Sequence, residues 1–219
     1  LVQELLVAAL DQLRPDDLVS IVTYAGSTSV RLEPTPVSEA DTIADVIAGL
    51  TSSGGTAGAD GINLAYDQAA AGFIQGGINQ VILCTDGDFN IGPSSNDELV
   101  EIIEERRREG VTLTALGFGY GNLNDGMMEL VSNAGNGIYA VIYDEDRATE
   151  FLERHLFSSV VHVAKDMKIQ VEFNADHVAA YRLLGYVNRA IADSDFRVDT
   201  VDAGEVGAGH RVTALYELV

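Results

Sequence analysis

Residues 81–90 of this chain read Val81-Ile82-Leu83-Cys84-Thr85-Asp86-Gly87-Asp88-Phe89-Asn90. The uninterrupted apolar run at the start is typical of a strand buried on both faces of a parallel sheet. Asp86 follows where the strand leaves the sheet, and in open α/β sheets ligands bind outside the carboxyl ends of the strands. Asp86 is therefore the first candidate site residue. The alternative, equally supported by the local sequence, is that Asp86 caps a turn, because Asp-Gly is a common turn pair.

Around this strand, helical and strand patterns alternate up to about residue 157. Ser38 is expected to cap one of the helices. Apolar spacing predicts helices over residues 1–13, 41–49, 62–73, 96–108, 125–133 and 146–157. Apolar and β-branched runs predict strands over residues 17–24, 30–32, 80–85, 111–116 and 138–142. This order predicts an α/β fold with a doubly wound, mostly parallel sheet.

After Ser158 the pattern changes to β-strands without helices between them. Strands are predicted over residues 161–163, 168–173, 181–186 and 212–218, and the segment 193–210 is expected to be a loop rich in Asp and Gly. We therefore expect one domain over residues 1–158 and an all-β extension over residues 159–219. So few strands leave exposed edges, so we expect the extension to pair with a missing or partner segment.

The composition indicates a folded, acidic protein. The 219 residues carry 34 acidic and 13 basic side chains, a formal net charge of −21. This balance argues against nucleic-acid binding, which relies on neutralising phosphates. The sequence contains no apolar run long enough to span a membrane. Cys84 is the one cysteine, so no disulfide forms within the chain.

Several motifs together resemble a von Willebrand factor type A domain over roughly residues 1–157. They are Leu13-Arg14-Pro15-Asp16-Asp17, Gly54-Gly55-Thr56, Thr85-Asp86-Gly87 and Leu116-Gly117-Phe118-Gly119. The β extension resembles that of a bacterial subgroup of cell-envelope-associated proteins, in segments 164–174, 181–183 and 202–205. The resemblance implies a Rossmann-like fold and a location in the cell envelope or outside the cytoplasm.

The resemblance also implies a metal-ion-dependent adhesion site at the carboxyl edge of the sheet. Thr56 and Asp86 match two of the family's ligand positions, and Mg²⁺, Mn²⁺ or Ca²⁺ is the implied ion, since hard ions prefer oxygen ligands. Gly55, Gly87 and Asp88 would form the rim that a protein partner touches, within a border made by the loops 52–57, 87–92 and 119–125. The partner could offer a carboxylate to the ion. The implied function is metal-dependent adhesion or assembly without catalysis.

The sequence departs from the family pattern at the first ion-binding loop. No Asp-x-Ser-x-Ser motif is present, and the strand that normally precedes it is also missing. The resemblance therefore implies a sheet that lacks its usual first central strand, and we expect the chain to be part of a longer protein. We also expect this chain alone to bind divalent ions poorly, or not at all, because Thr56 and Asp86 offer too few ligands.

Two alternatives remain open. The chain could be a structural docking subunit without a working ion site, in which the β extension binds another protein. Asp86-Gly87-Asp88 after an apolar strand also resembles the haloacid dehalogenase-like phosphotransferases, in which the first Asp is the nucleophile and the second an acid/base. That family places its motif on the first strand, whereas here it lies mid-chain.

Overall fold

The computed structural model describes residues 1–25, 27–51, 58–86, 96–119, 121, 123–153, 162–185, 191–198, 204–207 and 213–219. The chain divides into two compact units, Leu1–Leu156 and Phe157–Val219. The predicted domains, residues 1–158 and 159–219, stay a prediction, since a compact unit is not thereby shown to fold alone.

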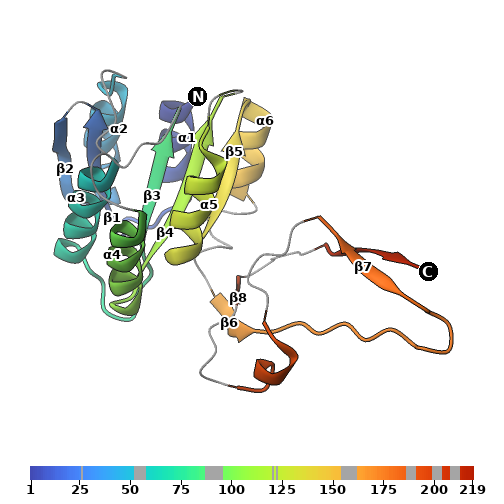
Figure 1. Ribbon diagram of the computed structural model, residues 1–219. Coiled ribbons are helices and arrows are strands. Elements are labelled where there is room, and N and C mark those ends of the chain that lie inside the picture. The colour runs from blue at the N-terminus through green and yellow to red at the C-terminus, as the bar shows by residue number, and fades with distance from the viewer. Residues whose placement is uncertain are drawn as a thin grey trace. The chain divides into compact units, whose positions relative to one another are not determined.

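The centre of the first unit is a three-stranded parallel sheet in the order β3-β4-β5. Its strands are β3 (Asn79–Thr85), β4 (Val111–Phe118) and β5 (Asn136–Ile142). Val81 pairs with Leu113, and Leu116 pairs with Ala140. Parallel strands need crossover connections, which here are α4 (Asn96–Arg108) and α5 (Asp125–Ala134). All three strands therefore end at the same edge of the sheet (Figure 1).

Helices cover both faces of this sheet. α3 (Gly58–Ala71), α4 and α5 pack on one face, where Tyr66, Ile103, Leu113 and Met128 are fully buried. Because side chains alternate along a strand, Leu116 points to the opposite face, where α6 (Glu145–Phe151) and α1 (Val2–Leu10) lie in Figure 1. The predicted α/β fold with helices around a parallel sheet is confirmed.

A hairpin of β1 (Leu18–Ala25) and β2 (Ser27–Pro36) forms a separate antiparallel sheet. α1 and α2 (Ala40–Ala48) pack against it in a second apolar cluster that includes Leu10 and Ile43. Within the described residues no backbone ladder joins β1–β2 to β3–β4–β5. Two separate groups of strands, β1–β2 and β3–β4–β5, are consistent with the predicted sheet that lacks its usual first central strand.

Three local predictions are wrong. β3 is buried on one face only, because Val81 and Leu83 are buried while Ile82 is 36% exposed. Ser38 does not cap α2; it lies in a 3₁₀ turn (Val37–Glu39), and the N-cap position is taken by Glu39 without a side-chain hydrogen bond. The third helix ends at Ala71, so Phe73 lies beyond it.

The second unit contains two small antiparallel sheets. β6 (His162–Met167) pairs with β8 (Gly204–Gly207), and β7 (Tyr181–Leu184) pairs with β9 (Leu215–Leu218). β8 lies in the Asp/Gly-rich segment that was expected to be a loop, and the same segment holds a 3₁₀ turn (Asp193–Asp195). The predicted strand over residues 168–173 is wrong, since this segment forms no ladder with the described residues.

Candidate metal and partner-binding edge

Asp86 lies directly after β3, at the carboxyl edge of the parallel sheet. Its side chain is exposed, and no hydrogen bond or ion pair to the described residues is recorded for its carboxylate. The buried positions Val81 and Leu83 anchor the strand, which ends at Thr85, and the chain bends at Asp86. The strand thus places an exposed carboxylate, without a partner among the described residues, at the carboxyl edge of the sheet.

Tyr24 lies beside Asp86, although it comes from the hairpin. Its hydroxyl donates a hydrogen bond to the backbone carbonyl of Cys84, so the end of β1 meets the end of β3. Burial raises the pKa of Tyr24, and the nearby charge of Asp86 adds to that rise. Tyr24 therefore stays neutral at ordinary pH and leaves the negative charge at this edge to Asp86.

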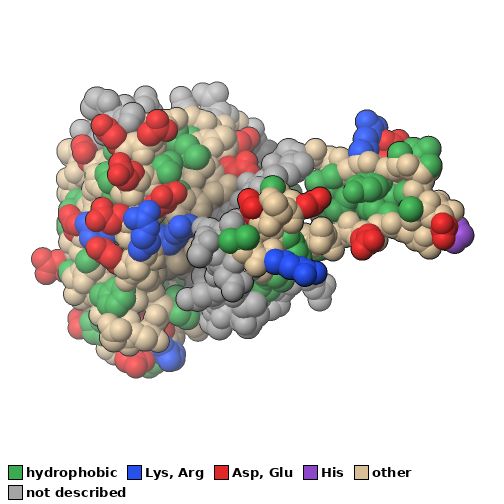
Figure 2. Space-filling model, turned by 60° about the horizontal axis from the view of Figure 1, so that its bottom comes forward, with side chains coloured by type: hydrophobic (Ala, Val, Ile, Leu, Met, Phe, Trp, Pro, Cys, Tyr) green, Lys and Arg blue, Asp and Glu red, His purple; other side chains and the backbone are tan. Residues whose placement is uncertain are grey.

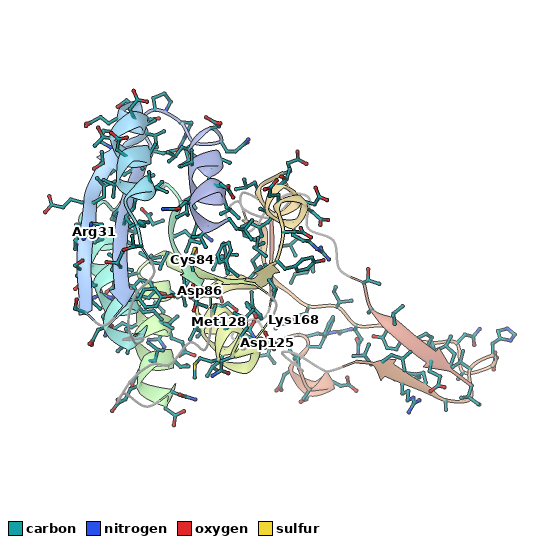
Figure 3. The ribbon with its side chains drawn as sticks, turned by 90° about the horizontal axis from the view of Figure 1, so that it is seen from above. Arg31, Cys84, Asp86, Asp125, Met128 and Lys168 are labelled. Atoms are coloured by element: carbon teal, nitrogen blue, oxygen red, sulfur yellow. The ribbon has the colours of Figure 1, made fainter. Side chains whose placement is uncertain are left out.

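The neighbouring strand, β4, brings a second carboxylate to this edge, Asp125 in the first turn of α5 (Figure 3). The Asn124 side chain caps the helix by accepting a hydrogen bond from the backbone N–H of Met127 at 3.2 Å. The Tyr139 hydroxyl donates to the Asp125 carboxylate at 2.5 Å. Burial raises the pKa of Tyr139, and the bond to Asp125 raises it further. Asp125 is thus held in place, whereas Asp86 has no described partner.

Most of the predicted site residues lie outside the described part of the chain. They are Gly55, Thr56, Gly87 and Asp88. Of the predicted ligands, the structure therefore places Asp86 alone. Among the described residues, no group of three or more His, Cys, Asp and Glu side chains could hold a metal ion. The role predicted for Thr56 stays a prediction.

Asp125 is the residue to which sequence reasoning gave no role. It falls in the loop 119–125, which was expected to border the site, but its contact with Tyr139 joins residues 14 positions apart. A signal was present in the sequence: Asn124-Asp125 follows β4 at the same edge and begins a helix, as N-cap preferences predict.

The surface of the described residues has two hollows away from Asp86. One, of about 300 Å³, lies between α3 and α4 and is lined by Ala59, Leu99 and Ile102 with three glutamates (Glu98, Glu101 and Glu105). The other, of about 350 Å³, lies along β5 and α6, with Val141, Phe151 and Arg147 in its lining. Neither contains Asp86.

The first unit has a Rossmann-like α/β fold with two carboxylates, Asp86 and Asp125, at the carboxyl edge of its sheet. The chain belongs to the von Willebrand factor type A domain family, whose model matches residues 1–155. Residues 158–219 match a second model, described as "Uncharacterized protein YfbK, C-terminal". Domains of the type A family usually mediate metal-dependent protein interactions and are generally not enzymes.

Two curated relatives are similar over long ranges. The uncharacterized protein YfbK of Escherichia coli (strain K12) is 40% identical over 218 residues, covering 100% of this chain and 38% of the relative. The uncharacterized protein sll0103 of Synechocystis is 27% identical over 154 residues, covering 70% of this chain and 36% of the relative. The chain thus spans well under half the length of these relatives.

Solved structures share the fold of the first unit. The conserved hypothetical protein BatB from Bacteroides thetaiotaomicron has a TM-score of 0.56 at 22% identity, covering 69% of this chain and 83% of BatB. Proximal thread matrix protein 1 from the mussel byssus, whose structure has a zinc-occupied MIDAS motif, has a TM-score of 0.54 at 20% identity, covering 69% of this chain and 38% of that protein. The described helices include none long and apolar enough to cross a membrane.

Proposed function

We propose that this chain supplies part of a divalent-ion-dependent protein-interaction surface, located at the carboxyl edge of its parallel sheet. The observation that carries the proposal is the exposed Asp86 carboxylate, which has no partner among the described residues. Thr56 would supply a second oxygen ligand, and Gly55, Gly87 and Asp88 would form the rim around the ion. The interaction is non-catalytic, in keeping with the family.

The chemistry of Asp86 fits a hard divalent ion. Mg²⁺ keeps several of its waters and is often held by one or two carboxylates, so it does not need a cage of protein ligands. The zinc-occupied MIDAS motif of the mussel protein, which shares this fold, supports divalent-ion binding. A bound ion would supply a positive charge that attracts an oxygen of a protein partner. Asp86 would hold the ion, and the neighbouring Tyr24 hydroxyl, whose pKa is raised by burial, would stay protonated.

An ion titration tests the role of Asp86. We expect Mn²⁺ and Mg²⁺ to bind this chain weakly, and Asp86→Asn to weaken that binding by about tenfold or more, because the substitution removes a charged oxygen ligand. Asp41→Asn is the matched control, since Asp41 is an exposed carboxylate in the first turn of α2. Equal titration curves for the wild-type chain and Asp86→Asn would contradict the proposal.

A second experiment separates this function from that of a docking subunit without a working ion site. The apolar surface of the second unit supports the docking alternative, since Tyr181 is 58% and Leu215 62% exposed. The metal-dependent surface predicts that a chelator releases the protein partner and that Asp86→Asn does the same. Docking without an ion predicts that the partner stays bound under both conditions.

The phosphotransferase alternative has its own measurement. It requires Asp86 as nucleophile and Asp88, outside the described residues, as acid/base. Phosphatase activity that is lost in Asp86→Asn would support it. We also propose a location in the cell envelope or outside the cytoplasm, which rests only on the sequence resemblance of the β extension to a bacterial subgroup of cell-envelope-associated proteins. Fractionation of the natural host is the test.

A further inference from the structure

Residues Met167–Phe173 form an exposed, extended segment that continues from β6 (Figure 1). Met167 is 37%, Ile169 66% and Val171 41% exposed. Beyond Met167, the last residue of β6, the segment joins no ladder with the described residues, and no backbone hydrogen bond to them is recorded for it. An exposed strand with open backbone groups is a template for pairing with another strand.

The side chains of this segment alternate strictly. Met167, Ile169, Val171 and Phe173 would share one face of a strand, while Lys168, Gln170 and Glu172 would share the other. Phe173 packs against Tyr181 and Tyr216 of the β7–β9 sheet, with ring centroids 4.7 and 5.2 Å apart. Apolar side chains gather on the surface of this unit (Figure 2).

We propose that Met167–Phe173 pairs with the same segment of a second copy of this chain. The two strands run antiparallel, and the two-fold axis passes at Gln170, so that Gln170 faces its own copy. In this register Lys168 of each copy lies opposite Glu172 of the other, Ile169 lies opposite Val171, and Met167 lies opposite Phe173. The contact is isologous, as is usual for symmetric dimers.

The order of residue types in the segment favours this register and favours a second copy of the same segment as the partner. Every apolar side chain faces an apolar one, and both charges face their opposites, which stabilises antiparallel pairs. Methionine beside an aromatic ring adds a favourable sulfur contact. A shift by one residue would place apolar side chains opposite polar ones. The sequence Met-Lys-Ile-Gln-Val-Glu-Phe is therefore complementary to itself.

The charges permit the contact. Lys168 and Glu172 cancel, so the segment is locally neutral in a chain whose net charge is −21. At physiological ionic strength the Debye length is about 8 Å, which screens repulsion between the distant acidic surfaces. The Lys168 ammonium donates to the backbone carbonyl of Val198 at 2.6 Å. An ammonium has three donors, so this bond can persist beside an ion pair.

Sedimentation velocity over a concentration series tests the proposal. We expect a reversible dimer, and we expect Lys168→Glu and Glu172→Lys each to weaken it by about tenfold, since each reverses two symmetry-related charge pairs. The double variant restores both pairs, so its dimerisation should return towards that of the wild-type chain. Glu101→Lys, an equal charge reversal on α4, is the control and should not weaken the dimer.

Oxidative cross-linking tests the register. Gln170→Cys should form a disulfide-linked dimer, because directly opposed residues lie within disulfide reach. Ala175→Cys, exposed in the following turn, should not, because the two copies of residue 175 lie at opposite ends of the paired strands. The wild-type chain controls for Cys84, the one native cysteine, whose side chain is partly buried in β3. A monomer at every concentration, or a dimer insensitive to these variants, would overturn the proposal, as would pairing of this segment with a different protein.

Discussion

Tyr24 connects the β1–β2 hairpin to the parallel sheet through its hydroxyl, which donates to the Cys84 carbonyl. β3 is an edge strand of its sheet, and no described strand pairs with its other side. α3 packs directly on the tyrosine, because a Cβ added at Gly61 would lie 2.5 Å from the Tyr24 Cβ. The Tyr24 side chain thus links the β1–β2 hairpin to β3, between which no backbone ladder forms among the described residues.

Replacing Tyr24 by Phe should lower the free energy of unfolding by about 1 kcal/mol, since the Cys84 carbonyl loses its hydrogen bond in a half-buried setting. Urea denaturation at neutral pH measures the change. Tyr181→Phe is the matched control: Tyr181 is 58% exposed and should tolerate the loss of its hydroxyl. Equal losses in the two variants would show that Tyr24 does not join the two sheets.

At the scale of elements, the turn from α5 to β5 is the tightest described join between a helix and the sheet. Leu113 of β4 donates its N–H to the Gly135 carbonyl at 2.9 Å. Asn136 has a φ of 52°, a left-handed conformation that Asn tolerates better than most residues. A Cβ added at Gly137 would lie 1.9 Å from the Leu113 carbonyl oxygen. The turn therefore requires glycine where the two backbones meet.

Gly137→Ala should lower the free energy of unfolding by about 3 kcal/mol or more, because the clash is with backbone and β4 or β5 must shift. Gly126→Ala is the control, since Gly126 lies in α5 with open space around its added Cβ. It should raise stability by about 0.5–1 kcal/mol through its better helix propensity. If Gly137→Ala yields too little folded protein for denaturation, its soluble yield against that of Gly126→Ala gives the comparison. Similar stability of the two variants would contradict the close approach.

At the scale of the whole molecule, buried acids of high pKa set the response to alkali. Burial raises the pKa of the Cys84 thiol to about 12 and also raises the pKa of Tyr66. The Tyr66 hydroxyl is buried without a hydrogen-bond partner among the described residues. Each group loses its proton more readily in the unfolded chain than in the folded one. The contribution of these two groups to the free energy of unfolding is therefore fully present below their pKa values in the unfolded chain. It is lost as the pH rises from these values through the higher pKa values of the folded state.

We expect the free energy of unfolding to stay level up to about pH 9 and then to fall, with Tyr66 contributing up to about 1.4 kcal/mol per pH unit above about pH 10. Urea denaturation at a series of pH values measures this slope. Tyr66→Phe should be neutral or stabilising at pH 7, since it removes an unpaired buried hydroxyl, and should make the alkaline slope shallower. An unchanged slope in this variant would exclude Tyr66 as its source.

The candidate site could be predicted from the sequence only in part. Asp86 could be predicted because it directly follows an apolar strand pattern in the sequence. The carboxyl ends of parallel strands lie at one edge of the sheet, where ligands bind. The contact of Asp125 with Tyr139 and that of Tyr24 with Cys84 could not be found in this way. They join residues 14 and 60 positions apart, and no local pattern records such distances.

The sequence by itself determined the kind and order of nearly all the elements of the first unit, because helical and strand periodicities are local properties of the chain. The tertiary structure decided which faces are buried and which strands pair. The run Val81–Cys84 is equally apolar on both sides, yet Ile82 is exposed. Residues 168–173 alternate between polar and apolar side chains, as a strand does, yet they pair with no described strand. The strand that pairs with β6 is instead β8 (Gly204–Gly207). Burial and pairing depend on what the rest of the chain brings alongside, and this information is not contained in the segment itself.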